Sequence, residues 1–282
     1  PAVNRAIQGD HDVQERPRTL PTRTLSELLN ETFAIYGRHF GRFLALVAVV
    51  QVPVGLLALI PGGGMVTVIV VGIISLIASV CVYGATNFAV GQQYLIGEIR
   101  IGDCYSRVLW RGLTFVLLAG LLLGALVLPM SVVMALAWVT VGPVGTTLVA
   151  AVVAVPIVAH WAIALESVTF EGHKTRGALV RTFELVRGDW WRVYRTTLVI
   201  LLVTLGVGIL LTLPIGIAAW IAAPEQANLL SKAFQFIGSL AVGIIAPPVV
   251  YISLTLLYYD LRVRKEDYDF TSMSREMGIA PA

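Results

Sequence analysis

Charged residues are scarce in this sequence. Only 13% of its 282 residues are Asp, Glu, Lys or Arg, and hydrophobic residues make up 57%. Soluble domains carry about a quarter of charged residues. The mean hydropathy of +0.83 points the same way. The scarcity of charge excludes a soluble globular domain and predicts an all-α protein that crosses a membrane several times.

Cysteine is also scarce, and the usual catalytic signatures are missing. Cys81 lies in a predicted span and Cys104 on the predicted cytoplasmic side, so a disulfide framework is excluded. The sequence contains no phosphate-binding loop of the Walker type, no nucleophile elbow, no HExxH motif and no zinc-type spacing of Cys and His. We therefore expect a protein that is not an enzyme and holds no metal or cofactor.

Long apolar stretches are what the sequence does contain. Crossing a bilayer core takes about 20 helical residues. Six stretches are long enough: residues 43–60, 65–90, 112–138, 144–165, 196–221 and 233–259. The sequence thus predicts a six-span membrane domain over residues 23–262, preceded by a polar cytoplasmic tail (1–22) and followed by a second one (263–282).

Lys and Arg residues are concentrated near the chain ends and in two of the connections between spans. All of the 20 Lys and Arg residues except Lys232 lie toward the two chain ends or in the connections after the second and fourth spans. Because cytoplasmic connections are enriched in Lys and Arg, both termini and both long connections are predicted to be cytoplasmic. This topology requires residues 174–187 and 262–265 to lie at the same end of the protein. The net charge of +3 indicates a membrane surface and not nucleic acid.

Short amphipathic segments precede the spans. Thr24 and Glu27 form a capping box at the start of the first one. Sliding the chain by 150 residues aligns Thr32-Phe33 with Thr182-Phe183, and a shift of 76 sets residues 109–112 on 185–188. We therefore predict three helix-hairpin repeats at about 24–96, 103–170 and 175–262, each preceded by a cytoplasmic helix in the membrane interface.

Cationic and aromatic residues near these segments are expected to contact anionic lipid of the cytoplasmic leaflet. They are Arg38, Arg42, Arg107, Arg111, Arg176, Arg181, Arg187, Trp190, Trp191, Arg192 and Arg195. Small residues in the spans are expected to let helices pack closely. They are Gly84, Gly91, Gly120, Gly124 and Gly206.

Polar residues inside the spans are the candidates for chemistry, because they are costly in hydrocarbon. His160 is interpreted as hydrogen-bonded to a neighbouring helix, with a haem or pigment ligand as the alternative. Glu166 is expected to form a salt bridge with Arg176, Arg181 or Arg262, and Asp260 with Arg262. Interhelical hydrogen bonds are expected for Asn87 and for the glutamines of the spans.

Several stretches carry a family resemblance. Residues 25–44, the segments Ala178-Leu-Val-Arg181 and Leu185-Val-Arg-Gly188, and residues 257–266 resemble the glycerophosphoryl diester phosphodiesterase membrane domain family and the related YciC-like bacterial inner-membrane proteins. The resemblance implies a six-span module without catalytic activity. The phosphodiesterase barrel of some family members is missing here, because no polar stretch approaches the roughly 250 residues that it needs.

These observations give a leading hypothesis and two alternatives. The first is an accessory or scaffold subunit that docks to anionic lipid and, in part through residues 1–22, to partner membrane proteins. The second is a carrier of a lipid or small amphiphile, in which Arg181 or Arg192 meets a phosphate and a water-accessible cavity reaches past His160. The third is pigment or haem binding through His160.

Overall fold

The computed structural model describes residues 20–57, 64–110, 152–222 and 229–279, with isolated positions between 112 and 149. The regular elements in these residues are helices, so the all-α prediction is confirmed for this part of the chain. Most of the predicted span 112–138 lies outside the described residues, as do Arg111, Gly120, Gly124 and tail residues 1–19.

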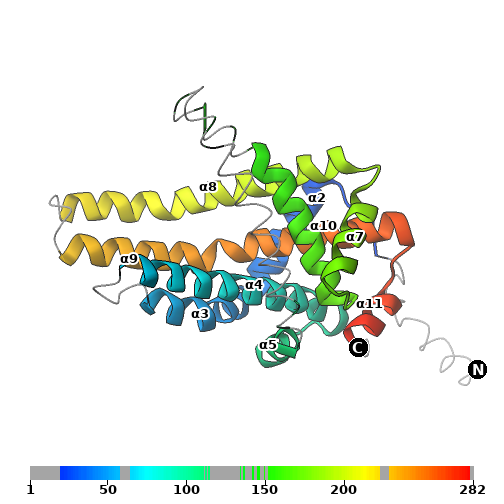
Figure 1. Cartoon of the computed structure of the whole chain (residues 1–282). Coiled ribbons are helices and arrows are strands. Elements are labelled where there is room, and N and C mark those ends of the chain that lie inside the picture. The colour runs from blue at the N-terminus through cyan, green and yellow to red at the C-terminus, as the bar shows by residue number, and fades with distance from the viewer. Residues whose placement is uncertain are drawn as a thin grey trace, which may run out of the picture.

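Five segments of the described chain are long and apolar enough to cross a membrane. They are α3 (Phe40–Leu57), α4 (Met65–Ile96), the helix Val152–Phe170, α8 (Trp190–Ala222) and the pair α9 (Leu229–Ile245) and α10 (Pro247–Glu266). The protein is therefore a multi-pass membrane protein. In Figure 1, α3, α4, α8 and α9 run side by side, whereas Val152–Phe170 crosses α10 obliquely.

Several of these helices are longer than a bilayer requires. The 33 residues of α8 give a length of about 50 Å at 1.5 Å per residue, against a hydrocarbon core of about 30 Å. The 32 residues of α4 give nearly the same length. The helix bundle is thus long enough to extend beyond the hydrocarbon by roughly 20 Å.

The last predicted span, 233–259, is broken. It consists of α9 and α10, which are separated at Ala246. Pro247 and Pro248 have no N–H group to continue the hydrogen-bond ladder, so the helix must restart there. Tyr36 donates its hydroxyl hydrogen bond to the carbonyl of Ile245, at 2.9 Å, and so satisfies an acceptor at the break. Burial raises the pKa of Tyr36 to about 12, which keeps this donor protonated.

Helix α10 lies at the centre of one half of the bundle. Every residue from Ile252 to Arg262 is buried, so this helix is covered on all sides. It contacts α2 (Leu25–Arg38), α3, α4, α7 (Thr175–Val186), α8 and α9. Figure 1 shows α10 in the interior, with α2 and α7 beside it. The apolar run at 247–259 therefore packs against protein.

Four short helices gather at one end of the bundle, here called the charged end (Figure 1). They are α2, α5 (Ile101–Trp110), α7 and α11 (Phe270–Met277). Each buries the residues three and seven positions after its start. These pairs are Leu28 and Thr32, Cys104 and Val108, Ala178 and Thr182, and Met273 and Met277. The stretch 263–282, predicted as a tail, thus contains a packed helix.

The starts of α2, α5 and α7 are regularly spaced, at residues 25, 101 and 175, which are 76 and 74 residues apart. A shift of 150 keeps the same order of buried and exposed positions from residue 28 to 41 and from 178 to 191. Between α5 and α7 the burial pattern matches at a shift of 74. A shift of 76 would set the buried Cys104 on Val180, which is 52% exposed.

The turns before three of these short helices share a left-handed residue. Gly97 has a φ of 71° before α5, Gly172 has a φ of 72° before α7, and Asp267 has a φ of 50° before α11. Glycine adopts this conformation without steric cost, which explains the first two positions. The residue at 267 is an aspartate, one of the few other types that tolerate it.

Gly91 tests the packing of α11 on α4. A Cβ atom at this position would lie 2.6 Å from Cε of Met277 and 3.2 Å from the hydroxyl oxygen of Tyr259. We expect Gly91→Ala to lower the free energy of unfolding by about 1 kcal/mol, because the methyl group forces the flexible but buried end of the Met277 side chain to move. The measurement is thermal or chemical unfolding in detergent.

Gly206→Ala is the matched control, because no described atom lies within 4 Å of a Cβ at Gly206. It adds the same methyl group to a helix and should leave stability unchanged or slightly raised. Adding Met277→Ala to Gly91→Ala should recover part of the loss. Equal effects of the two glycine substitutions would contradict this packing.

Candidate functional site

Asp260 of α10 is a buried carboxylate surrounded by donors at the charged end. Its side chain is 0% exposed. Its oxygens accept hydrogen bonds from the backbone N–H of Arg23 at 2.7 Å, from Nη2 of Arg192 at 2.5 Å and from Nε of Arg264 at 3.1 Å. The carbonyl of Arg23 accepts from the same two guanidinium groups, at 2.8 and 3.2 Å. One carboxylate thus connects the segment before α2 with α8 and α10.

Asp260 does not pair with Arg262, which corrects the sequence-based expectation. Residues two positions apart point to different sides of a helix, whereas Asp260 and Arg264 share a face at the i, i+4 spacing. Arg262 instead forms a two-pronged ion pair with Glu276 of α11, at 2.7 and 2.8 Å. Its guanidinium also lies 3.8 Å from the ring centre of Tyr268. The ion pair of Arg262 therefore stabilises the packing of α11 on α10.

A third ionic contact joins α7 to α10. Arg181 pairs with Glu171, Nε to Oε2 2.9 Å, and also with Glu266. Lys265 donates to the carbonyls of Glu184 and Arg187, at 3.1 and 2.5 Å, and so satisfies acceptors at the end of α7. Residues 174–187 and 262–265 therefore lie at the same end of the protein, as the predicted topology requires.

Glu166 is not in a salt bridge with any of the three arginines expected for it. The carboxyl is fully buried between α4 and α10. Oε1 accepts from the hydroxyls of Tyr83, at 3.0 Å, and Thr255, at 2.9 Å. Thr255 also lies 3.1 Å from Oδ1 of Asn87, which confirms the interhelical hydrogen bond expected for Asn87. The sequence analysis did not single out Tyr83 or Thr255, because a lone hydroxyl in an apolar run gives no signal of its partner.

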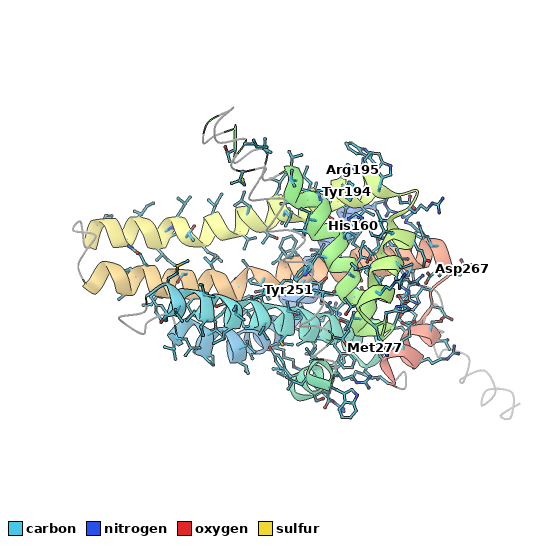
Figure 2. The ribbon with its side chains drawn as sticks, in the orientation of Figure 1. His160, Tyr194, Arg195, Tyr251, Asp267 and Met277 are labelled. Carbon is cyan, nitrogen blue, oxygen red and sulfur yellow. The ribbon has the colours of Figure 1, made fainter. Side chains whose placement is uncertain are left out.

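His160 is hydrogen-bonded within its own helix, which corrects the expected bond to a neighbouring helix. Its Nδ1 lies 2.7 Å from the carbonyl of Pro156, one turn earlier, so Nδ1 carries the proton and donates. The ring centre lies 5.3 Å from that of Phe183 and 5.8 Å from that of Tyr194, and Figure 2 shows His160 beside Tyr194. Its partners are thus a carbonyl of its own helix and aromatic rings of α7 and α8. The described residues contain no group of three or more His, Cys, Asp and Glu that could hold a metal ion.

The predicted lipid-contacting residues divide into two sets. Arg181 and Arg192 are engaged in internal ion pairs. The others within the described residues are exposed: Arg38, Arg42, Arg107, Arg176, Arg187, Trp190, Trp191 and Arg195. Arg107 lies over the ring of Phe88, at 4.9 Å. The two tryptophans contact each other edge to face, with 54% and 65% of their surfaces exposed.

The predicted packing glycines also differ among themselves. Gly84 and Gly91 are buried on α4, and Gly91 lies against α11. Gly206 is exposed on α8, and a Cβ there would meet no described atom within 4 Å. Any close packing at Gly206 therefore involves something other than the residues that the structure describes.

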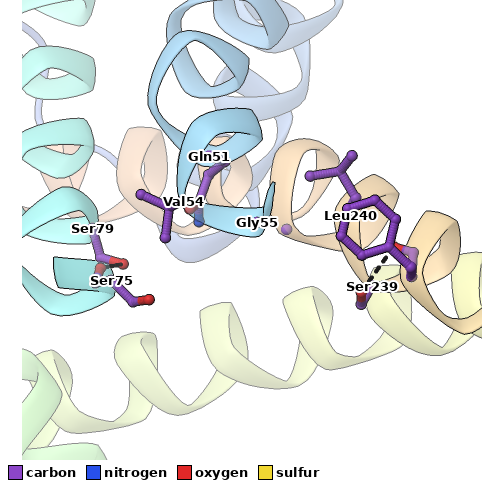
Figure 3. A pocket seen from close by; sticks show the side chains of 9 residues that line it. Gln51, Val54, Gly55, Ser75, Ser79, Ser239 and Leu240 are labelled. Carbon is purple, nitrogen blue, oxygen red and sulfur yellow. Dashed lines mark hydrogen bonds between the residues drawn. The ribbon is translucent and has the colours of Figure 1, made fainter. Parts of the chain in front are cut away.

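Cavities lie between the described helices, and two of them contain polar groups. One of about 270 Å³ opens between α3, α4 and α9 and combines apolar side chains with Gln51, Ser75, Ser79 and Ser239 (Figure 3). The other, of about 340 Å³, lies at the charged end between α4, α5 and the end of α11, and includes Arg100, Asp103 and Arg107. His160 lines neither of them.

Comparison with known proteins gives no relative: no family model, no curated protein and no solved structure matches the chain. The family resemblance drawn from the sequence therefore stays a prediction. The contacts within the molecule carry the functional argument.

Asp260→Asn tests the ionic contact that joins three chain segments. The substitution removes the negative charge between Arg192 and Arg264 and leaves a buried donor cluster without its counter-charge. We expect a loss of about 3–5 kcal/mol in the free energy of unfolding. Asp103→Asn makes the same chemical change at an exposed position and should cost less than about 1 kcal/mol. Similar losses for both variants in denaturant titrations would rule out this role.

His39 makes the free energy of unfolding depend on pH, and the direction of its pKa shift gives the sign. Its partial burial lowers its pKa below 6.5, Arg42 and Arg38 add to the effect, and Gln93 opposes it. Nε2 of His39 is buried without a hydrogen bond in the described residues. Below pH 6.5 the unfolded chain therefore binds more protons than the folded one, and stability falls as the pH decreases toward the folded pKa.

We expect His39→Gln to remove this part of the pH dependence. The measurement is the free energy of unfolding of wild type and variant between pH 8 and about pH 5.5, and the difference between the two isolates His39. A difference that stays constant over this range would contradict the assignment.

Proposed function

We propose that this protein is a non-catalytic accessory or scaffold subunit of the bacterial inner membrane. In this proposal it docks to partner membrane proteins through its spans and to anionic lipid through the charged end. The observation that carries the proposal is the exposure of α8. Only 6% of the residues in the most apolar 18-residue stretch of this helix are buried, although α8 packs along α9 and α10.

The exposed side of α8 has the character of a helix-docking surface. Leu202, Leu205, Leu210 and Leu213 are all more than half exposed. Gly206 lies among them, and no described atom occupies the space next to it. Small residues among leucines let another helix approach closely, so a transmembrane helix of a partner protein is the occupant that we propose.

The ionic contacts of the charged end favour a static role. Asp260, Arg262 and Arg181 together hold α2, α7, α8, α10 and α11 in one arrangement. A carrier would have to rearrange such contacts during each transport cycle. A scaffold benefits from them, because a rigid surface loses little conformational entropy when it binds.

The membrane topology belongs to the same proposal. We infer six spans in three repeats, with both termini cytoplasmic and with α2, α5 and α7 at the cytoplasmic interface. The equal burial patterns and the 76- and 74-residue spacing support the repeat. Exposed apolar residues on the outer side of the short helices support contact with lipid. They are Phe33, Leu109, Trp110, Val180 and Phe183. Exposed Arg38, Arg42, Arg176, Arg187 and Arg195 are the cations that would meet lipid phosphates.

A carrier of a small amphiphile is the second candidate. The cavity of about 270 Å³ favours it, because its hydroxyl and amide groups lie in predicted spans. Arg181 and Arg192, which were expected to meet a phosphate, are already paired, whereas Arg100 and Arg107 line the other cavity. The third candidate, haem or pigment binding, requires a ligand bond from Nε2 of His160, and an absorption spectrum of the purified protein tests it.

The scaffold proposal is tested by purification in a mild detergent. We expect wild type to retain defined membrane proteins in near-stoichiometric amounts, identified by mass spectrometry, and Gly206→Leu to lose them by filling the exposed side of α8. Gly72→Leu is the matched control, because Gly72 is also an exposed helical glycine with no described atom near its Cβ position. A wild type that is purified without companions, or equal losses for both variants, would contradict docking at α8.

A further inference from the structure

Glu166 lies where three helices meet, beside hydroxyl and amide groups that carry no charge. Its own helix, Val152–Phe170, meets α4 at Tyr83 and α10 at Thr255. Both neighbours are 0% exposed, as is Glu166 itself. This carboxyl is therefore shielded from water by protein on every side.

The two fully buried carboxyl groups of the described chain differ in their partners. Asp260 is neutralised by Arg192 and Arg264. Glu166 has no Lys, Arg or His within 4.0 Å among the described residues. An ionised carboxylate without a cation in such a site costs several kcal/mol, so the two groups require different protonation states.

A hydrogen-bond inventory leads to the same result. Thr255 has one proton, and its Oγ1 has three acceptors within reach: the carbonyl of Tyr251 at 2.9 Å, Oε1 of Glu166 at 2.9 Å and Oδ1 of Asn87 at 3.1 Å. If Oε1 carries a proton, it can donate to Thr255, which then donates to Tyr251 or Asn87, while Tyr83 donates to Oε1. Every one of these hydroxyl protons then has an acceptor.

The ionised form would be poorly satisfied. Oε2 of Glu166 is buried without a hydrogen-bond partner in the described residues, and so are Nδ2 of Asn87 and the hydroxyl of Tyr259. An uncharged carbonyl oxygen without a partner costs far less than an unpartnered carboxylate oxygen. The surrounding atoms therefore suit a neutral acid.

We propose that Glu166 is a proton-binding site: its carboxyl carries an exchangeable proton at neutral pH, and Tyr83, Asn87 and Thr255 position it. The titratable groups that face it are Tyr83 of α4 and Tyr258 and Tyr259 of α10. Tyr258 donates its hydrogen bond to Glu171, which pairs with Arg181 at the charged end. Removal of the proton places an uncompensated charge where the three helices meet and so destabilises their packing.

Infrared spectroscopy of the full chain in lipid vesicles tests this site. We expect wild type at neutral pH to show the carbonyl band of a protonated carboxylic acid, which shifts in heavy water and disappears at high pH. Glu166→Gln should remove the band, and Tyr83→Phe should shift it by removing one hydrogen bond. Glu184→Gln, at an exposed carboxylate, should leave it unchanged.

The outcomes separate the alternatives. If Glu166→Gln does not fold, the shift in Tyr83→Phe still assigns the band. Absence of the band in wild type at neutral pH overturns the proposal. A band that sodium chloride removes at constant pH also overturns it, in favour of a sodium ion bound by the same oxygen atoms. A band that survives in folded Glu166→Gln places the proton on another residue.

Discussion

The burial of α10 on all sides is the constraint on which the rest of the structure depends. A helix covered by protein must find partners for most of its polar side chains within the protein, because water does not reach them. Asp260, Arg262 and Thr255 each find partners on a different neighbouring segment: the start of α8, α11, and the helix Val152–Phe170. The polar residues of α10 thereby determine which elements surround it.

This constraint divides the protein into two halves of different character. Around α10, ion pairs and hydrogen bonds fix the short helices, and aromatic residues such as Tyr258 and Tyr259 fill the interior. Toward the other end, α3, α4, α8 and α9 contact one another mainly through apolar side chains, and much of their surface is exposed. The first half has the properties of a folded core, and the second those of a lipid-embedded hairpin bundle.

The sequence predicted what depends on local pattern. The capping box at Thr24 and Glu27 is confirmed, as are the all-helical class and several apolar helices, because periodicity and composition are local properties. The partners of Asp260 and Glu166 were wrong, since they depend on which helices become neighbours. The apolar run of α9 and α10 is long enough to cross a membrane, as predicted, but its break at Ala246 and the burial of α10 in protein were not predicted, because burial in protein and burial in lipid select the same residues. Helix α11 was missed, although Asp269 as N-cap and the i, i+4 pair Met273 and Met277 indicate it.

The interruption at Ala246 has a consequence for the way in which the protein fits its bilayer. A continuous helix from Leu229 to Glu266 would pass any change of tilt directly into the packed core. With a joint at this point, α9 can change its angle to α10 in a thinner or thicker hydrocarbon layer, where mismatch costs a fraction of a kcal/mol per Å. The change of angle is not passed along α10, so adaptation to bilayer thickness reaches the ion pairs around Asp260 only through α8, which runs unbroken from Trp190 to Ala222.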